Sequence, residues 1–549
     1  MMAGTSKLGW YAQRLRAMSP AEMLHRLKER WRHRGDSAFV EKLVEVDPGP
    51  AVAQMPLLPH LNTVPWNVRV SIRTDAEELM AGRWTLFGWR KSDVGSPPCW
   101  HRDASSGVIV EPEGWSHRLD HRHLPDGADV RTIWEINRWS QMTRVAMHGW
   151  IDRNPQALET AQGWLEDWLE RNPVGHGVNW TSALEVALRL MNFAWFDALV
   201  EAAGSESIRH KQAELARRVV PAHALWVARY KSFGSSANNH LLGELAGLLH
   251  AVKRWPALEV HVGTATEIWE GIASCVMKQF AADGGNKEQA LHYHLFAWEM
   301  AWHARRLMVV HREDVTQRLR SAAEFFVRML HPVEPWDFGD SDDAEVLPFA
   351  LSRETAAAEW QQWMAGGGEA GALHFWLGAS PLRLSGADGD CWWLARESGM
   401  AVGESAGWLA RLDASPLGYG SLAAHGHCDA LHLSLWDGGQ AVVIDPGTGG
   451  YYGMNERRTR LAAWDAHNGP QPEAGYVTPR RLGTFLWSGH HRTPEMKVVD
   501  AQTLSGEFKH EERLVTRAVT CRTDGVIRVT DEMSGEVTFV TRWCLSPEC

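Results

Sequence analysis

The chain has 549 residues, which is too long for a single hydrophobic core and predicts two or three domains. Its hydrophobic content of 44% and its charged content of 22% are typical of a soluble globular protein. The formal net charge of −11 argues against nucleic acid and anionic membranes as partners.

The N-terminal 34 residues are basic and lack the apolar core of a signal peptide. They predict an amphipathic helix that begins at Ser19-Pro20-Ala21-Glu22. As written, the chain is expected to be cytoplasmic, or periplasmic or secreted if a leader has been removed. No stretch approaches the roughly 18 apolar residues of a membrane span. The seven cysteines are scattered without CxxC spacing and predict reduced or buried thiols.

Residues 48–128 are rich in Pro, Gly and Trp, so residues 1–128 are expected to be an N-terminal helix with an irregular or short-stranded lead-in. From 129 to 380, helical periodicity dominates. The expected helices span 156–171, 182–202, 207–230, 239–254, 263–282, 290–310 and 315–330. Helices without intervening strands predict a toroid or an α-solenoid, and the lack of a fixed repeat disfavours the solenoid.

From residue 385 to 549 the patterns shorten to strands that are separated by turns such as Asp524-Gly525. The segment 430–444 predicts two strands joined by the turn Asp437-Gly438-Gly439. The last expected strand spans 537–543. We therefore predict an antiparallel β-sandwich over 385–549.

A histidine-rich motif, His425-Gly426-His427-Cys428-Asp429, precedes this hairpin. If the motif is part of a strand, His425, His427 and Asp429 project to one face. Asp445 follows the second strand and His467 follows a loop. Two imidazoles and a carboxylate from three segments suit a zinc-type site. The alternative is a pair of half-buried histidines in a sheet.

Together with upstream motifs, this region resembles the heparinase II/III superfamily of polysaccharide lyases. The upstream motifs are Trp134-Glu135-Ile136-Asn137-Arg138, Asn172-Pro173, Gly177-Val178-Asn179-Trp180, Glu185, Arg189, Asn238-Asn239-His240, Asp283-Gly284-Gly285, Glu288-Gln289, Tyr293-His294 and Gly339-Asp340-Ser341-Asp342. The resemblance covers nearly the whole chain. It implies a multidomain α and β fold, in which an N-terminal α/α toroid (an incomplete barrel of helical hairpins) is followed by an antiparallel β-sandwich. Family members usually carry more β-structure, so a truncated or short C-terminus is expected.

The resemblance also implies β-elimination at a uronic acid. That reaction needs a group that neutralises the uronate carboxylate, a base for the C5 proton and an acid for the leaving oxygen at C4. The implied groups are Asn239 with His240 for the carboxylate, Tyr293 as acid and for some substrates also base, and His425 as base or carboxylate neutraliser. A helix N-cap at Asn238-Asn239 and a buried core tyrosine at Tyr293 are the alternatives.

The implied substrate-binding residues are Trp180, Glu185, Arg189, His294, Arg457 and Arg458. Helix packing by Trp180 and a surface pair between Glu185 and Arg189 are equally compatible with the sequence. The implied metal ligands, for one structural Zn²⁺, are His427, Asp445 and His467. The metal would fix the His467 loop and so hold His425. No organic cofactor is expected.

The predicted function is therefore a polysaccharide lyase. Its substrate would be an acidic polysaccharide, namely a lightly sulfated glycosaminoglycan such as heparan sulfate, alginate or a bacterial exopolysaccharide. Whether the chain forms a homodimer is left open by the sequence. Trp464-Asp465-Ala466 before His467 departs from the family pattern and leaves the substrate class open.

One alternative is a non-catalytic carbohydrate-binding or exopolysaccharide-assembly protein on the same fold. Another is a glycoside hydrolase using Asp340, Asp342 and Asp343. The 30 tryptophans suit either a sugar cleft or helix packing.

Overall fold

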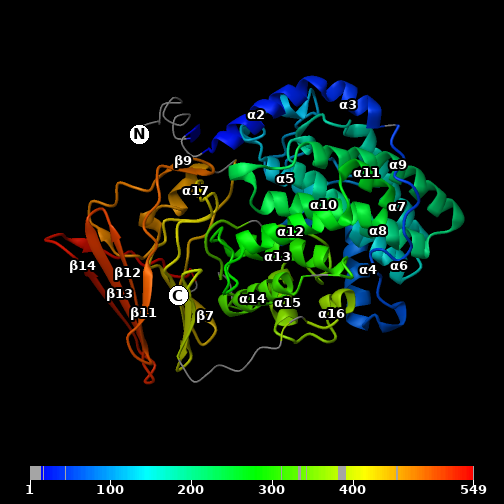
Figure 1. Ribbon diagram of the computed structural model, residues 1–549. Coiled ribbons are helices and arrows are strands. Elements are labelled where there is room, and N and C mark those ends of the chain that lie inside the picture. Colours follow the sequence, from blue (N-terminus) through cyan, green and yellow to red (C-terminus); the bar gives the residue numbers. More distant parts are fainter. Residues whose placement is uncertain are drawn as a thin grey trace.

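The computed structural model describes residues 14–15, 18–43, 45–310, 312–331, 336–341, 343–380, 382, 391–452 and 455–547. A helical body and a β-domain lie side by side in it (Figure 1). The predicted boundary at residue 385 lies outside the described residues, as do Asp342 and Cys549. The predicted fold class, a helical toroid followed by an antiparallel β-sandwich, is confirmed.

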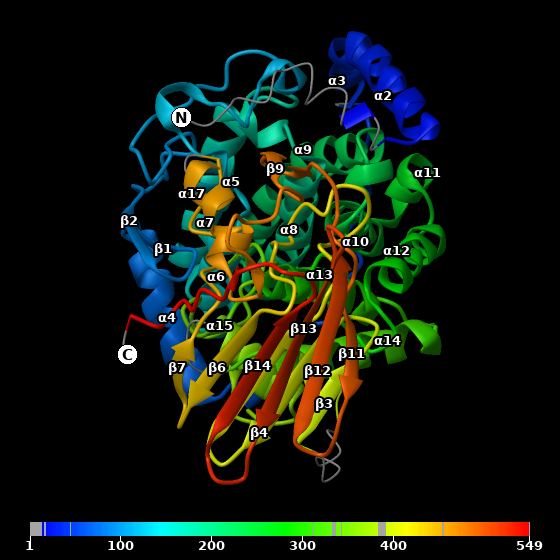
Figure 2. The same ribbon diagram turned by 90° about the vertical axis from the view of Figure 1, so that its left-hand side faces the viewer.

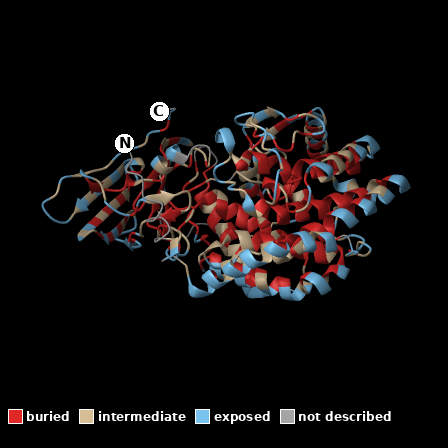
Figure 3. Ribbon diagram, turned by 90° about the horizontal axis from the view of Figure 1, so that it is seen from above, coloured by how far each residue is buried: buried red, intermediate tan, exposed pale blue. Residues whose placement is uncertain are grey.

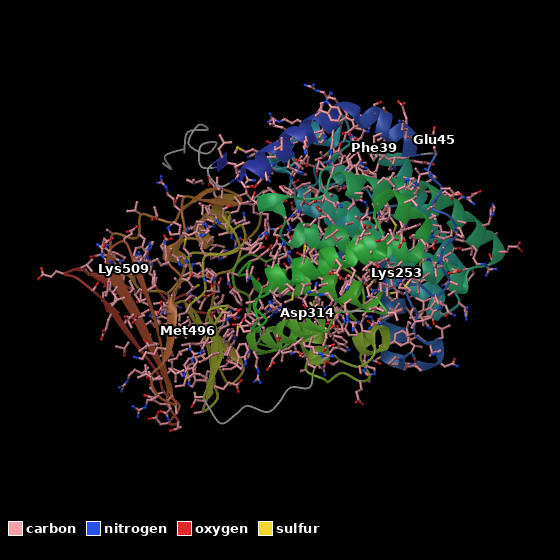
Figure 4. All side chains as sticks on the ribbon, viewed as in Figure 1. Phe39, Glu45, Lys253, Asp314, Met496 and Lys509 are labelled. Carbon is pink, nitrogen blue, oxygen red and sulfur yellow. The ribbon has the colours of Figure 1, made fainter. Side chains whose placement is uncertain are left out.

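The N-terminal arm consists of α2 (Pro20–Arg32) and α3 (Asp36–Leu43). Ser19 caps α2 by accepting a hydrogen bond from the backbone N–H of Glu22 at 3.1 Å, so the predicted amphipathic helix begins where the sequence placed it. The arm runs along the top of the helical body (Figure 1), and Figure 4 labels Phe39 on α3 and Glu45 just after it, at the end of the arm away from the β-domain.

Two buried carboxylates attach this arm to the rest of the chain. Glu22 accepts a hydrogen bond from the backbone N–H of Ser235 at 3.0 Å. Asp36 accepts one from Nε of Arg229 at 3.1 Å. Both contacts flank the segment that leads into α10, so the arm is fixed against the approach to Asn239.

Helices that follow one another in sequence pack as hairpins, such as α6 on α7, α8 on α9 and α13 on α14, and α10 lies against α8, α12 and α13. The helices of the body are α4 (Trp66–Met80), α5 (Val130–Asn137), α6 (Ser140–Ile151), α7 (Pro155–Arg171), α8 (Ala183–Ala203), α9 (Glu206–Arg229), α10 (Asn239–Arg254), α11 (Glu259–Val262), α12 (Ala265–Gln279), α13 (Leu291–Arg306), α14 (Glu313–Met329), α15 (Ala356–Met364) and α16 (Ala372–Leu377).

The interior of the helical body is rich in tryptophan. Seen from above, its inner helices are largely buried and its rim is exposed (Figure 3). Among the twelve largest fully buried side chains of the described residues, ten are tryptophan and the other two are Arg189 and Arg254. Helix packing therefore accounts for many of the tryptophans that the sequence left undecided.

The lead-in over 48–128 was predicted to be irregular or short-stranded, but it also contains a helix, α4. This helix packs on α6 and buries Val68, Ile72, Ala76 and Leu79. Their spacing of three and four residues is a helical signal that the Pro- and Gly-rich surroundings obscure. The short strands β1 (Arg83–Leu86) and β2 (Arg90–Asp93) pair as a hairpin.

The β-domain contains two antiparallel sheets that face each other (Figure 2). Side chains from both sheets, including Leu412 and Leu433 on one and Leu504 and Val519 on the other, form one buried cluster. The five-stranded sheet comprises β3 (Trp392–Ala395), β4 (Met400–Ser405), β5 (Trp408–Asp413), β6 (Leu433–Asp437) and β7 (Gln440–Val443). The four-stranded sheet comprises β11 (Glu495–Val498), β12 (Thr503–His510), β13 (Arg513–Cys521) and β14 (Ile527–Met533).

Shorter elements complete the β-domain. They are β8 (Gln471–Pro472), which pairs with β15 (Phe539–Val540), then β9 (Arg481–Gly483), which pairs with β10 (Leu486–Trp487), and α17 (Asn455–Leu461). The strand predicted at 537–543 is thus limited to β15. Figure 1 shows α17 and β9 at the upper end of the β-domain, beside the helical body. Within the described part of the chain, no helix is long and apolar enough to cross a membrane.

Candidate active site

A cavity of about 510 Å³ lies where the helical body, the N-terminal arm and the β-domain meet. The start of α10 contributes Asn239 and His240 to its lining, and α13 contributes Tyr293. His425 and Tyr451 reach it from loops of the β-domain. The structure therefore brings together the four residues predicted as catalytic.

The two asparagines at the start of α10 have different partners. Asn238 is the N-cap, and its side chain accepts a hydrogen bond from the backbone N–H of His240 at 3.3 Å. Asn239 is fully buried and donates from Nδ2 to Oε2 of Glu288 at 2.8 Å. Its backbone N–H donates to Oε1 of the same carboxylate at 3.2 Å. Asn238 thus caps the helix, and Asn239 lies at the cavity wall.

Tyr293 and His425 are in direct contact across the domain boundary. Their rings are stacked with centroids 3.8 Å apart and planes inclined by 22°. The hydroxyl oxygen of Tyr293 lies 2.9 Å from that of Tyr451. The guanidinium carbons of Arg131 and Arg458 lie 4.2 Å and 4.6 Å from the Tyr451 ring centroid. Two hydroxyls and an imidazole are therefore gathered in a positively charged setting.

Asp340 holds His425 from behind the cavity. Its carboxylate is fully buried and lies 3.3 Å from Nδ1 of His425 and 3.3 Å from Nε2 of His427. Arg458 donates to it from Nε at 3.1 Å, and Nη2 of Arg481 lies 3.6 Å away. Burial alone would raise the pKa of Asp340, but these two guanidinium groups hold it well below its usual value. The carboxylate is thus an anion that orients both histidines.

Glu288 approaches His425 from the opposite side. Its Oε2 lies 4.0 Å from Nε2 of the imidazole. Burial raises the pKa of Glu288, while His425 and the hydrogen bonds from Asn239 oppose that rise. Glu288 therefore connects the amide of Asn239 with the imidazole of His425, a connection that the sequence motif did not reveal.

The prediction that His425, His427 and Asp429 alternate on a strand is wrong. They lie in irregular backbone ahead of β6. Contacts from distant segments fix this backbone instead, since the carbonyl of His425 accepts from the N–H of Asp340 at 2.8 Å and the N–H of Cys428 donates to Ala462. The predicted hairpin β6–β7 that follows is confirmed.

Behind this segment, four buried side chains converge. His427, Asp429, Asp445 and His467 each place one potential ligand atom within 4.8 Å of the others. Within the described part of the chain, Nδ1 of His427 and Oδ2 of Asp429 have no hydrogen-bond partner, and Nε2 of His467 lies 3.4 Å from Oδ2 of Asp445. The remaining ring nitrogens are engaged, Nε2 of His427 with Asp340 and Nδ1 of His467 with the carbonyl of Ala463 at 2.9 Å. This donor set, with both rings held from outside, suits a zinc-like cation.

The six predicted substrate-binding residues separate into two groups. Trp180 and Glu185 line the cavity, and Glu185 accepts two hydrogen bonds of 2.8 Å from Arg138 instead of forming the alternative surface pair with Arg189. The other four, Arg189, His294, Arg457 and Arg458, are not among the lining residues.

The reasons for their positions differ. Arg189 is fully buried among tryptophan rings, 5.0 Å from that of Trp168, and donates to the carbonyl of Asn179 at 2.7 Å. His294 is buried, and its Nε2 lies 2.8 Å from the carbonyl oxygen of Ala322. Arg457 is exposed on α17, and Arg458 is engaged by Asp340. A sequence motif gives residue types but not which side of a helix faces a cavity.

Two residues with direct contacts in the site, Tyr451 and Asp429, were given no catalytic or ligand role from the sequence. The pair Tyr451-Tyr452 follows the loop at Asp445, and two of only seven tyrosines in adjacent positions would have been a usable signal. Asp429 belongs to the histidine motif, but its place among the converging side chains depends on loop geometry.

Comparisons with known proteins agree with this architecture. The family model for the heparinase II/III-like C-terminal domain matches residues 388–549. A solved structure of heparinase III matches with a TM-score of 0.61 at 17% identity, covering 95% of this chain and 79% of that one. A mutant of heparan sulfate lyase HepC from Pedobacter heparinus matches with a TM-score of 0.52 at 16% identity, covering 93% and 75%. Another heparinase III matches with a TM-score of 0.52 at 16% identity, covering 97% and 80%. A search of curated proteins finds no match. At these identities the solved structures establish a shared fold.

Proposed function

We propose that this chain, a member of the heparinase II/III superfamily, is a polysaccharide lyase that cleaves a uronic-acid-containing polysaccharide by β-elimination. The observation that carries the proposal is the contact between Tyr293 and His425, stacked 3.8 Å apart at a cavity that Asn239 also lines. The solved neighbours include a heparan sulfate lyase, which supports a glycosaminoglycan as the substrate class.

The residues present can divide the work that elimination requires. The amide of Asn239 donates to the uronate carboxylate and so offsets the charge that builds up as the C5 proton leaves. His425 takes that proton, the electron pair of the C5–H bond forms the C4–C5 double bond, and the electron pair of the C4–O bond leaves with the oxygen. The hydroxyl of Tyr293 protonates this oxygen, and Tyr451, 2.9 Å away, is the group from which Tyr293 can recover a proton. The product has a C4–C5 double bond, and no water is consumed.

The described carboxylates do not favour hydrolysis. A hydrolase needs two carboxyl groups on either side of the bond. Asp340 is engaged by Arg458, and Asp343 lies 3.0 Å from Nε2 of His292. Of the described residues, the carboxylates that line the cavity are Glu29, which lies 3.5 Å from Nε2 of His25, and Glu185, which is paired with Arg138.

One Zn²⁺ held by His427, Asp445 and His467, with Asp429 as an additional ligand, is part of the proposal. The convergence of their buried ligand atoms supports it. The ion would supply structural cross-linking. His427 shares Asp340 with His425, so a fixed His427 also fixes the imidazole at the cavity.

The masses of the fragments test the reaction class. Elimination yields one fragment that is lighter by a water than the hydrolysis product. Mass spectrometry that shows this unsaturated, lighter end supports the proposal. Saturated fragments whose masses together exceed that of the parent by one water would instead identify a hydrolase.

A further inference from the structure

The cavity wall is strongly basic although the chain as a whole carries a net charge of −11. Two glutamates, Glu29 and Glu185, line the cavity together with five arginines, which are Arg14, Arg26, Arg122, Arg131 and Arg138. Glu185 neutralises Arg138 through two hydrogen bonds, and Glu29 lies 3.5 Å from Nε2 of His25. The lining therefore carries an excess of positive charge that the composition of the chain does not predict.

Part of this charge is concentrated at the N-terminal arm. Nη2 of Arg26 donates to Oε1 of Glu22 at 3.1 Å, and Nη2 of Arg14 lies 3.5 Å from the same oxygen. Glu22 also accepts the backbone N–H of Ser235, so one carboxylate serves two guanidinium groups and a backbone donor. Within the described part of the chain, Nη1 of Arg14 and Nε of Arg26 are buried without a hydrogen-bond partner.

Arg122 joins this cluster to the catalytic end of the cavity. Its guanidinium carbon lies 5.8 Å from the ring centroid of Phe485, and that ring packs edge-on against His425 with centroids 5.5 Å apart. Burial lowers the pKa of Arg14, and the positive charges of Arg26 and Arg122 lower it further. Two guanidinium groups, those of Arg14 and Arg26, thus share a single carboxylate, and the nearby positive charge of Arg122 adds to the repulsion on Arg14, which an added anion would relieve.

We propose that Arg14, Arg26 and Arg122 form a second anion subsite, which binds a carboxylate or sulfate group on a sugar beyond the one that is cleaved. Arginine suits both groups, because its planar fork donates two parallel hydrogen bonds to a carboxylate or a sulfate. The identity of the ligand as part of the substrate rests on the proposed function. The subsite makes the enzyme selective for chains that carry more than one anionic group per binding site.

The test measures binding without turnover, by titration calorimetry on the Tyr293→Phe protein. The probes are an unsulfated heparosan tetrasaccharide, its N-sulfated counterpart, an alginate tetrasaccharide, and an unsulfated hyaluronan disaccharide with a single carboxylate. Arg26→Gln combined with Arg122→Gln is expected to weaken binding of at least one tetrasaccharide about tenfold, which is roughly 1.4 kcal/mol. Binding of the disaccharide is expected to change less than twofold.

The pattern among the probes identifies the anion. A loss confined to the N-sulfated tetrasaccharide assigns the subsite to sulfate, and a loss with alginate or heparosan assigns it to a carboxylate. Arg30→Gln is the matched control, because Arg30 is exposed on the same helix and does not line the cavity. Its affinities should equal those of the parent protein.

Equal affinity of the parent and the double variant for all three tetrasaccharides would overturn the subsite. Arg122→Gln alone guards against misfolding, since this side chain is exposed and its loss should not disturb the Glu22 anchor. Because binding is measured without cleavage, the two proposals fail separately. If the double variant binds more weakly but the wild-type protein cleaves no polymer, only the lyase proposal is contradicted. If the wild-type protein cleaves a polymer but the double variant binds as the parent does, only the subsite is contradicted.

Discussion

Nδ2 of Asn239 lies 2.8 Å from Oε2 of Glu288, and both side chains are buried. Both oxygens of this carboxyl group accept from Asn239, one from the backbone N–H and one from Nδ2, so Glu288 determines which end of the amide faces it. One Nδ2 hydrogen is used by Glu288, and the other stays available for a uronate carboxylate. The orientation of the amide is thus a property of the pair and not of Asn239 alone.

Glu288→Gln should reduce kcat by about 10- to 100-fold, because a glutamine can donate as well as accept and no longer fixes the amide of Asn239. The free energy of unfolding should change by no more than about 2 kcal/mol. Steady-state kinetics and chemical denaturation measure both quantities. Glu299→Gln is the matched control, since Glu299 is buried on α13 and does not line the cavity. Unaltered kcat in Glu288→Gln would show that the pair has no part in orienting Asn239.

Tyr293→Phe should lower kcat by about 10²- to 10⁴-fold, because it removes the acid that protonates the leaving oxygen. The phenyl ring can keep its stacking on His425, so thermal unfolding should be nearly unchanged. Tyr476→Phe provides the comparison, since its hydroxyl bonds to the carbonyl of Pro470 and Tyr476 does not line the cavity. Full turnover in Tyr293→Phe would remove this residue from the mechanism.

The purified protein should contain about one zinc ion per chain, and His467→Ala should lose it together with thermal stability. Elemental analysis of the protein after extensive dialysis measures the metal directly. The control is His250→Gln, a buried histidine of the helical body bonded to the carbonyl of Ala246 at 2.8 Å. Equal metal content in the wild type and in His467→Ala would contradict the assigned ligands.

Stability should depend on pH through Glu244. Burial raises the pKa of this carboxyl group to about 8, although Ser232 donates to it from N and Oγ, each at 2.7 Å. Between the unfolded pKa of about 4.3 and the folded value, the folded state holds a proton that the unfolded state has lost. Stability therefore falls as pH rises through this window, by up to about 1.4 kcal/mol per pH unit from this one group.

Glu244→Gln removes this titration. As pH rises from 5.5 to 7.5, the free energy of unfolding of the variant should increase relative to that of the wild type. Chemical denaturation at several pH values measures this difference. Parallel pH profiles for the two proteins would show that Glu244 is not protonated in the folded state.

Much of the fold could be predicted from local signals. Ser19 followed by Pro20 marked the start of α2, and the turn Asp437-Gly438-Gly439 marked the hairpin β6–β7. The α4 helix was missed because its buried positions lie in a segment dominated by Pro, Gly and Trp. The backbone of His425 to Asp429 was missed for a different reason, because contacts with Asp340 and Ala462 override the local alternation.

The site was predictable as a set of residue types and not as a set of contacts. Asn239, Tyr293 and His425 converge as the motifs indicated. The roles of Glu288 and Asp340 depend on pairings between residues 49 and 85 positions apart in sequence, which no local pattern encodes. Arg189 was predicted to bind substrate because it belongs to a family motif, but it is fully buried in the tryptophan-rich interior.

The most direct test of the account is the ultraviolet absorbance of the wild-type protein and of Tyr293→Phe during incubation with heparan sulfate, heparin, hyaluronan, chondroitin sulfate, alginate and a bacterial exopolysaccharide. A C4–C5 double bond conjugated to the carboxylate absorbs, whereas a hydrolysis product does not. The account predicts a rise with at least one polymer for the wild type and a rise that is at least about 100-fold slower for the variant. Fragments that shorten without any rise in absorbance, or an equal rise for both proteins, would contradict it.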